Sequence, residues 1–373
     1  MNKQEILKIR SAVNKAFKLF EPPTDLTVSQ WADQKRVLSA EASSESGKFY
    51  TNRAEYQRGI MDAFSDPHVE DVVCMTSAQI GKTEILNNIV GFFIDQDPSP
   101  MLVLQPTVDM AQAYSKDRLA PMVRDNPCLR DKVKDPKAKD SGNTILHKTF
   151  SGGHITIVGA NSPSSLASRP IRIVLCDEVD RYPESAGGEG DPINLAKKRN
   201  TTFWNKKNAL FSTPTIKGLS RIESAYEQSD KRKYYVKCPH CNFEQTLMWG
   251  QVKWEDSDPS TAYYECADCR AQLNDTDKIN MVKTGRWIAE NPFNGIAGFH
   301  INELYSPWRK FADTVKDFLN SKKDTEKLKT WVNTALGETW EEQGDINFFT
   351  DKKVLPEAEN LGLQKLEDVH RGI

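Results

Sequence analysis

A Gly-Lys-Thr triplet at residues 81–83 is the feature that most restricts what this chain can fold into. It follows the apolar run DVVCM (71–75) and opens TEILNNIVGFFI (83–94), in which apolar residues recur at helical spacing. A strand, a loop and a helix joined in this way have the form of a P-loop, G-x-x-x-x-G-K-[ST], although Thr76 stands where the first glycine is expected. The pattern predicts an α/β protein with a mostly parallel sheet.

Each residue of the triplet has a chemical role in such a loop. Gly81 would let backbone N–H groups curl around phosphates, Lys82 would reach the β and γ oxygens, and the Thr83 hydroxyl would bind Mg²⁺. An isolated Gly-Lys-Thr triplet is also compatible with an ordinary helix start, so the prediction depends on a second motif.

That second motif is IRIVLCDE (171–178), an apolar strand that ends in two carboxylates, Asp177 and Glu178. In a Walker B segment the first acid holds Mg²⁺ and the second polarises the attacking water. The alternative is a solvated acidic turn after a core strand. Two matched halves in one α/β pattern predict an enzyme that binds and hydrolyses ATP, with Mg²⁺ as the second cofactor.

Two further pairs are candidates for contact with ATP. Ser212 and Thr213 follow the strand-like run that begins at residue 209, where small hydroxyls could sense the γ-phosphate or simply end the strand. Upstream of the triplet, Tyr56 and Gln57 could stack on and read an adenine base, or could be surface positions of a helix.

Four of the seven cysteines form two Cys-x-x-Cys pairs, Cys238/Cys241 and Cys266/Cys269. Each pair can form a tight turn that presents two thiolates, and two such turns complete a tetrahedral site. The spacing predicts a structural zinc ribbon, and the odd total argues against a disulfide framework.

The charge balance makes a globally basic nucleic-acid coat implausible, because 50 Lys and Arg residues face 52 Asp and Glu residues. Contact with DNA would need local charge. Residues 197–237 carry eleven Lys and Arg against three acids, which could track a phosphate backbone or be a solvated face. No apolar run approaches the roughly 18 residues that span a bilayer, so we expect a protein without membrane contact, located in the cytoplasm.

The pattern along the chain predicts four regions. Residues 1–50 hold an amphipathic helix and lead-in, either docked on the same chain or serving as a partner-binding arm. Residues 51–235 form the ATPase core and 236–275 the zinc ribbon. Residues 276–373 form a C-terminal helical segment and linker.

Together these motifs resemble the large terminase subunit of tailed bacteriophages, specifically the lambda-like GpA family. The resemblance rests on the combination of segments YQRGIMDAFSDP, SAQIGKTE, QPTVDMAQ, GANSPSSLASRPIRIVLCDEVDRYP, FSTPTIKGLSRIE, YEQSDKRKYYVKCPHC and GFHINELYSPW. It implies a RecA-like packaging ATPase. Several subunits would form a ring around double-stranded DNA at the portal protein of a procapsid in the bacterial host cytoplasm, together with a small terminase subunit.

The resemblance also implies roles for particular residues. Lys82 and Thr83 would bind phosphate and Mg²⁺, Asp177 the Mg²⁺, and Glu178 would be the catalytic carboxylate; Ser212 and Thr213 would couple hydrolysis to DNA movement. A ring ATPase needs an arginine at the γ-phosphate, supplied here in trans. Arg169 is favoured for its place before the Walker B strand, and the other candidates are Arg199, Arg221 and Arg232.

Members of the family are expected to continue into an endonuclease domain. The acidic residues Glu338, Glu341, Glu342 and Asp345 have no surrounding strand alternation and indicate an exposed linker. We therefore expect no endonuclease in this chain, and a nuclease truncated away or carried by a separate chain. The alternatives to a motor are a DExD-type helicase, suggested by Asp177 to Asp180, and a non-enzymatic zinc-ribbon DNA-binding scaffold.

Overall fold

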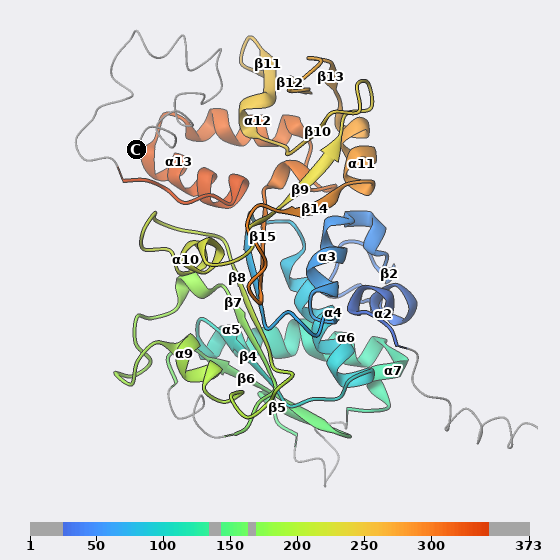
Figure 1. The fold of residues 1–373 in the computed structure, drawn as a ribbon, viewed down its shortest axis with the longest axis vertical. Helices are drawn as coiled ribbons and strands as arrows, with labels where there is room; N and C mark the ends of the chain where they lie inside the picture. Colours follow the sequence, from blue (N-terminus) through green and yellow to red (C-terminus); the bar gives the residue numbers. More distant parts are fainter. Residues whose placement is uncertain (1–24, 134–142, 163–168, 343–373) are drawn as a thin grey trace, which may run out of the picture.

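A computed structural model describes residues 25–133, 143–162 and 169–342. A ten-stranded sheet runs through it (Figure 1). From one end to the other the sheet contains β10 (Glu244–Gln245), β9 (Arg232–Lys237), β15 (Ile296–Ile301), β3 (Asp71–Thr76), β8 (Lys207–Ser212), β7 (Ile173–Asp177), β4 (Met101–Gln105), β6 (Gly153–Gly159) and β5 (His147–Phe150), and β14 (Arg286–Ala289) pairs with β9.

The middle of this sheet is parallel, and its ends are antiparallel. All neighbours from β9 to β6 run in the same direction, whereas β5 is antiparallel to β6, and β14 and β10 are antiparallel to β9. The predicted mixed α/β fold with a mostly parallel sheet is confirmed. The central strands are near-continuous apolar runs because helices cover both of their faces.

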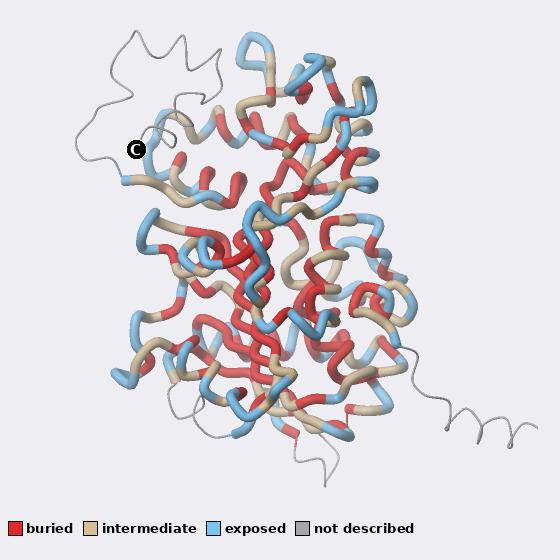
Figure 2. The backbone as a smooth tube through the Cα atoms, viewed as in Figure 1, coloured by how far each residue is buried: buried red, intermediate tan, exposed pale blue. Residues whose placement is uncertain are grey.

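Alternate residues of each strand enter separate cores on the two faces. Figure 2 shows that the strands in the middle of the sheet are mostly buried. One face packs against α2 (Val28–Lys35), α3 (Tyr56–Asp62) and α4 (Lys82–Asp95). The other packs against α9 (Pro192–Lys197) and α10 (Arg221–Glu227). Along β3, for example, Cys74 points into the first core while Val73 points into the second.

The remaining helices and short strands complete these layers. Between β4 and β5 lie α5 (Val108–Ala113), the π-helical η2 (Tyr114–Leu119), α6 (Ala120–Asp125) and α7 (Pro127–Arg130). A two-stranded sheet, β1 (Val37–Leu38) and β2 (Gly47–Lys48), and the short helices η1 (Thr51–Ala54) and η3 (Val179–Arg181) lie in connecting segments.

The C-terminal part of the described chain lies over one end of the sheet, at the top of Figure 1. It contains η4 (Trp249–Gln251), a small sheet of β11 (Val252–Glu255), β12 (Asp258–Glu265) and β13 (Gln272–Leu273), and the helices α11 (Asp275–Lys283), η5 (Glu303–Tyr305), α12 (Phe311–Ser321), α13 (Thr325–Trp331) and the π-helical η6 (Val332–Leu336). Its apolar residues, such as Trp249 and Leu336, belong to the same core as those of α4.

The described residues do not separate at the predicted domain boundaries. β9 crosses residue 235, and β14 and β15 belong to the main sheet although 276–373 was expected to be helix and linker. The predicted amphipathic helix within residues 1–24 lies outside the described residues, as does Asp345. Within the described ranges, no helix is long and apolar enough to cross a membrane.

Candidate functional site

The predicted phosphate loop, residues 76–83, joins the carboxyl end of β3 to α4. Gly81 is the N-cap of α4 and has a φ of +86°. The positive φ favours glycine, and a Cβ atom added here would also have to displace the side-chain amide of Gln57. The first N–H groups of α4 lack partners within the helix and can bind an anion in front of the loop.

Two buried side chains hold the loop from one side. The Tyr56 hydroxyl and the Gln57 amide both donate to the Ile80 carbonyl, at 3.1 and 2.9 Å. Tyr56 is 0% exposed and Gln57 is 2% exposed. Both residues therefore position the loop, and their predicted contact with an adenine base stays a prediction.

The region 301–337 holds the loop from the other side. Three hydrogen bonds fasten it: from the Ser77 N–H to the Ile301 carbonyl (2.9 Å), from the Ala78 N–H to the Thr334 carbonyl (2.7 Å), and from the Ser306 hydroxyl to the Gln79 carbonyl (3.1 Å). Sequence reasoning missed these contacts because no local pattern marks a residue whose partner lies so far away along the chain.

The strand ends bring three predicted residues together. Glu178 follows β7 in the left-handed backbone region, with a φ of +54°. One of its carboxylate oxygens lies 2.9 Å from the Lys82 ammonium, and the other accepts a hydrogen bond from the Thr213 hydroxyl at 3.4 Å. Lys82, Glu178 and Thr213 thus form one cluster at the carboxyl edge of the sheet.

Asp177, the last residue of β7, lies beside this cluster. Burial, with a further contribution from the Glu178 charge, raises the pKa of its carboxyl to about 6, although Lys82 acts in the opposite direction. The Gln105 amide, at the end of β4, donates to it at 3.1 Å. Gln105 was not a candidate, but its place at the end of a predicted strand could have identified it.

Ser212 connects the end of β8 to the turn after Glu178. Its buried hydroxyl donates to the Thr213 carbonyl at 2.8 Å and accepts from the Asp180 N–H at 3.3 Å. Asp180 in turn accepts from the Thr215 hydroxyl at 2.9 Å. Ser212 therefore fixes the strand end, and its coupling to DNA movement stays a prediction.

The favoured arginine is not part of this cluster. The Arg169 guanidinium donates to the His147 ring at 3.1 Å, on β5, the third strand beyond β7 in the sheet. A role for Arg169 at the Glu178 cluster of its own chain therefore lacks support, and a role in trans stays a prediction. Arg181, which was not a candidate, has its Nε 3.7 Å from Glu178.

Two of the other candidate arginines also bind elsewhere in the chain. Arg221 donates to the carbonyls of Tyr182 and Pro183, at 2.8 Å each, and so holds the turn that follows Glu178. Arg232 pairs with Asp230 at 2.7 Å. These contacts give both arginines structural roles within the chain.

The four paired cysteines converge as predicted from their spacing. Their sulfur atoms all lie within 4.8 Å of one another, with Cys238 to Cys269 and Cys241 to Cys266 at 3.8 Å. A Zn–S length of about 2.3 Å in a tetrahedral site puts sulfurs about 3.8 Å apart, so the cluster fits a metal ion of that size. The two turns have the same form, each with a left-handed residue four positions after the first cysteine, Asn242 and Arg270.

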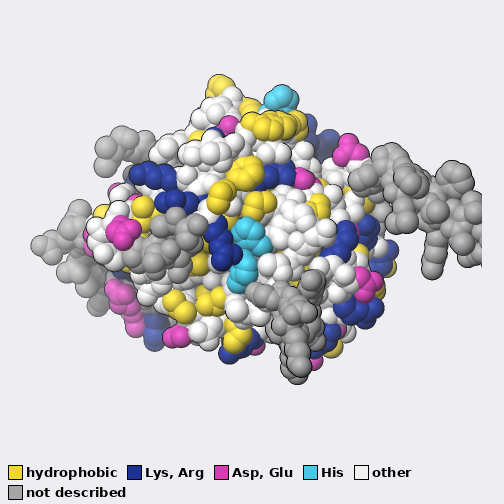
Figure 3. All heavy atoms as spheres, turned by 90° about the horizontal axis from the view of Figure 1, so that it is seen from below, with side chains coloured by type: hydrophobic (Ala, Val, Ile, Leu, Met, Phe, Trp, Pro, Cys, Tyr) yellow, Lys and Arg dark blue, Asp and Glu magenta, His cyan; other side chains and the backbone are white. Residues whose placement is uncertain are grey.

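The basic segment 197–237 does not form one stripe. β8 runs through the core between its two halves, and many of its cations already pair with acids: Lys197–Asp71, Lys206–Glu70, Lys217–Glu341, Arg221–Asp191, Lys231–Glu227, Arg232–Asp230 and Lys233–Glu290. On the face seen in Figure 3, Lys and Arg side chains likewise lie in separate groups. The predicted DNA contact of this segment stays a prediction.

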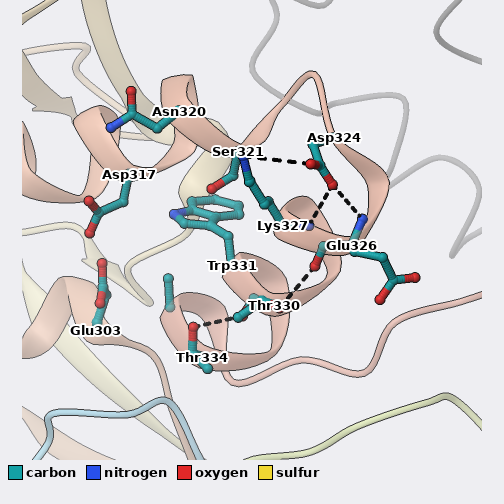
Figure 4. A pocket seen from close by; sticks show the side chains of 11 residues that line it. Glu303, Asp317, Asn320, Ser321, Asp324, Glu326, Lys327, Thr330, Trp331 and Thr334 are labelled. Atoms are coloured by element: carbon teal, nitrogen blue, oxygen red, sulfur yellow. Dashed lines mark hydrogen bonds and ion pairs between the residues drawn. The ribbon is translucent and has the colours of Figure 1, made fainter.

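A cavity of about 550 Å³ opens between α12 and α13 (Figure 4). Acidic and polar side chains line it, including Asp317, Asp324 and Glu326, with Trp331 on one wall. Lys82, Asp177 and Glu178 do not line this cavity. Its link to the loop is through Thr334, a lining residue whose carbonyl accepts from Ala78.

The fold and the loop define the class of the chain, a mixed α/β protein with a Walker-type loop at the carboxyl edge of a mostly parallel sheet. Within that class the chain belongs to the family of the phage terminase large subunit gpA. The family model of the gpA ATPase domain matches residues 43–287. The matched part of the family is its ATPase domain.

Individual relatives agree with this assignment. The chain is 32% identical over 350 residues to the terminase large subunit of Enterobacteria phage P21, covering 86% of this chain and 53% of that protein. It is 29% identical over 384 residues to the terminase large subunit of Escherichia phage lambda, covering 95% and 59%. The chain therefore spans little more than half the length of these relatives. The crystal structure of the HK97 bacteriophage large terminase has the same fold, with a TM-score of 0.51 and 12% identity over 85% of this chain and 55% of that one.

A second family model, for the gpA endonuclease domain, matches residues 296–366. The expectation that the chain contains no part of an endonuclease domain is therefore not supported. The described part of this match includes β15, α12 and α13. β15 lies inside the main sheet beside β3, so this stretch is physically continuous with the ATPase fold.

Proposed function

We propose that the chain is the ATP-hydrolysing part of a phage terminase, a motor that moves double-stranded DNA into a procapsid. The observation that carries this proposal is the Lys82, Glu178 and Thr213 cluster beside Asp177, at the end of the loop that opens α4. Nucleotides bind at this edge in open α/β sheets.

The residues present fit ATP and Mg²⁺. When bound, Mg²⁺ neutralises phosphate charge and aligns the phosphate oxygens. The Asp177 carboxylate is buried and its side-chain hydrogen-bond donor is the Gln105 amide, so a bound Mg²⁺ would offset the cost of burying its negative charge. Thr83, in the first turn of α4, would supply a hydroxyl ligand.

Lys82 and Glu178 would change partners when the nucleotide binds. Their 2.9 Å ion pair holds the Lys82 ammonium at the mouth of the loop. Transfer of that ammonium to phosphate oxygens would leave the Glu178 carboxylate free to accept a proton from the attacking water. Thr213 would keep the carboxylate oriented through its hydrogen bond.

The four-cysteine cluster would hold a structural zinc ion. Its sulfur spacing suits a tetrahedral thiolate site with all four positions filled by protein ligands, which leaves none open for catalysis.

The assembly would follow the family pattern. A homo-oligomeric ring would contact double-stranded DNA, the portal protein and a small terminase subunit in the host cytoplasm. The trans arginine, from Arg169 or another position, would come from the neighbouring subunit. The endonuclease match leaves nuclease activity within the same polypeptide or on a separate chain as alternatives.

ATP hydrolysis measured with and without DNA tests the proposal. Glu178→Gln should retain ATP binding and lose hydrolysis by about 10²-fold or more, the usual effect of removing a general base. Lys82→Ala should lose binding as well. Glu184→Gln, an exposed acid six positions further on, is the matched control and should hydrolyse ATP like the wild type.

Two outcomes would contradict the proposal. Negligible hydrolysis in the wild type at all DNA concentrations would favour the non-enzymatic scaffold. Full hydrolysis by Glu178→Gln would remove Glu178 from the mechanism.

A further inference from the structure

Trp308 is a large apolar ring that stays exposed next to the phosphate loop. Its surface is 40% exposed, and among the described residues only Trp204 is a more exposed tryptophan. The Cη2 atom of Trp308 lies 3.7 Å from the position that a Cβ atom on Gly81 would take. The ring therefore borders the turn that would bind phosphate.

The loop itself ties down the backbone that carries this ring. The backbone N–H of Trp308 donates to the Ser306 hydroxyl at 3.4 Å, and that hydroxyl donates to the Gln79 carbonyl of the loop at 3.1 Å. Trp308 thus has a defined position relative to the loop, although 225 positions separate it from Thr83, where the loop ends (308 − 83).

Two charged side chains that precede the loop in the sequence, Glu45 and Arg53, complete the surroundings. The Arg53 guanidinium lies 5.9 Å from the centre of the Trp308 ring, and its two hydrogen bonds to one Glu45 oxygen measure 2.8 and 3.2 Å. Arg53, and to a smaller extent Trp308, lower the pKa of the Glu45 carboxyl. An aromatic ring and a planar cation are thereby held in place beside the loop.

We infer that Trp308 is the platform on which the base of ATP stacks, with Arg53 beside it; this inference rests on the proposed ATPase function. A nucleotide whose phosphates occupy the loop must place its base at the border of the loop. An exposed indole offers that base a flat apolar face. Tyr56, predicted for this role, is fully buried and packs edge-to-face on Tyr234, so its ring has no free face.

The chemistry also indicates what Trp308 would not do. Stacking accepts any base because every base has a π-face. Trp308 would therefore strengthen nucleotide binding without selecting adenine over guanine.

Equilibrium binding of ATP and of inorganic tripolyphosphate, which has no base, tests the inference on the full chain. Trp308→Ala should weaken ATP binding about tenfold or more and leave tripolyphosphate binding unchanged. Trp308→Phe should keep most of the ATP affinity because its ring can still stack. Trp204→Ala, whose ring is 87% exposed in the turn before β8, is the control and should bind both ligands normally.

Tryptophan fluorescence gives a second readout. ATP should quench the wild type more than tripolyphosphate does, and Trp308→Phe should lose that difference while still binding ATP. Equal weakening of ATP and tripolyphosphate in Trp308→Ala would mean that Trp308 only supports the loop and would overturn the inference, as would unchanged ATP binding. Failure of the proposed function looks different, because then the wild type would bind neither ligand in a Lys82-dependent way.

Discussion

Gly337 is a single residue on which the shape of the phosphate loop depends. Its φ is +66°, and a Cβ atom there would lie 2.5 Å from the backbone nitrogen of Ser77. The neighbour is backbone and cannot move unless the loop moves with it. Gly337→Ala should therefore disturb a loop that lies 260 positions earlier (337 − 77).

We expect Gly337→Ala to weaken ATP binding about tenfold, with a loss of about 1–2 kcal/mol in the free energy of unfolding. Gly188→Ala is the matched control, since Gly188 has a φ of +87° but nothing within 4 Å of an added Cβ. Both variants carry backbone strain, and only Gly337→Ala crowds the loop. Equal ATP affinity in the two variants would contradict the prediction.

His300 makes the stability of the same region depend on pH. Its Nε2 contacts the Gly337 carbonyl at 3.1 Å, and burial lowers the pKa of the ring to about 4 from its ordinary 6.5. Between these values the unfolded chain binds a proton that the folded chain does not, so stability is full above pH 6.5 and falls as the pH drops toward 4. The full difference corresponds to about 3 kcal/mol.

His300→Gln keeps a donor for the carbonyl and removes the titration. Urea unfolding at about pH 7.5 and about pH 5 should show a larger loss of stability in the wild type than in the variant. The same loss in both proteins would show that other groups cause the pH dependence.

At the scale of single residues, sequence reasoning found the site residues that directly follow strands. It missed the residues that contact the site from distant positions in the sequence. Lys82, Asp177, Glu178 and Thr213 were predictable because parallel strands end at one edge, where their following residues gather. The contacts of Thr334 and Gly337 with the loop arise only from the fold. The burial of Tyr56 was likewise hidden, because helix periodicity does not say which neighbour covers a face.

At the scale of elements, β15 is one of the strands that sequence reasoning did not predict. Its residues alternate between apolar ones, such as Phe299, and Gly298 or His300, which is weaker than the continuous run of β3. The two strands nevertheless pair in full register, from Ile296 beside Asp71 to Ile301 beside Thr76. A strand that is defined by its neighbours more than by its composition is hard to predict from local pattern.

Tyr305 joins the segment that carries the two cysteine pairs, residues 238–269, to the main sheet. Its hydroxyl accepts from the Leu247 N–H and donates to the Tyr234 carbonyl on β9, at 2.6 Å each. Tyr305→Phe would leave both buried backbone groups without this partner, at a cost of about 1–3 kcal/mol in the free energy of unfolding. Chemical denaturation measures this cost.

Tyr50→Phe is the control for that prediction, because Tyr50 is 54% exposed. It should unfold like the wild type. A Tyr305→Phe variant as stable as Tyr50→Phe would mean that the two elements are held together by apolar packing alone.

At the scale of the whole molecule, the proposed zinc site and the proposed ATP site are mechanically connected. Tyr305 is hydrogen-bonded to Leu247, which lies in the chain between the two cysteine pairs, and its neighbour Ser306 is hydrogen-bonded to Gln79 of the phosphate loop. Removing the metal should therefore destabilise the phosphate loop as well as the segment that holds the four cysteines.

Metal analysis should find one zinc ion per chain in the wild type and none in Cys266→Ser. That variant should melt at a lower temperature and hydrolyse ATP more slowly. Cys128→Ser, a half-buried cysteine outside the cluster, should keep both properties. Purified wild type without zinc, or chelation without any change in melting, would contradict the prediction.

The place of β15 beside β3 has a consequence for how the protein is made. Ile296 leaves the ribosome 225 residues after its partner Asp71 (296 − 71), which takes about 10 to 45 seconds at ordinary rates of synthesis. During that time one edge of the apolar strand β3 lacks its neighbour, and an unpaired strand edge favours misassembly and chaperone binding. The proposed nucleotide site would therefore be among the last parts of the nascent chain to form, and an incompletely synthesised chain would not yet bind ATP.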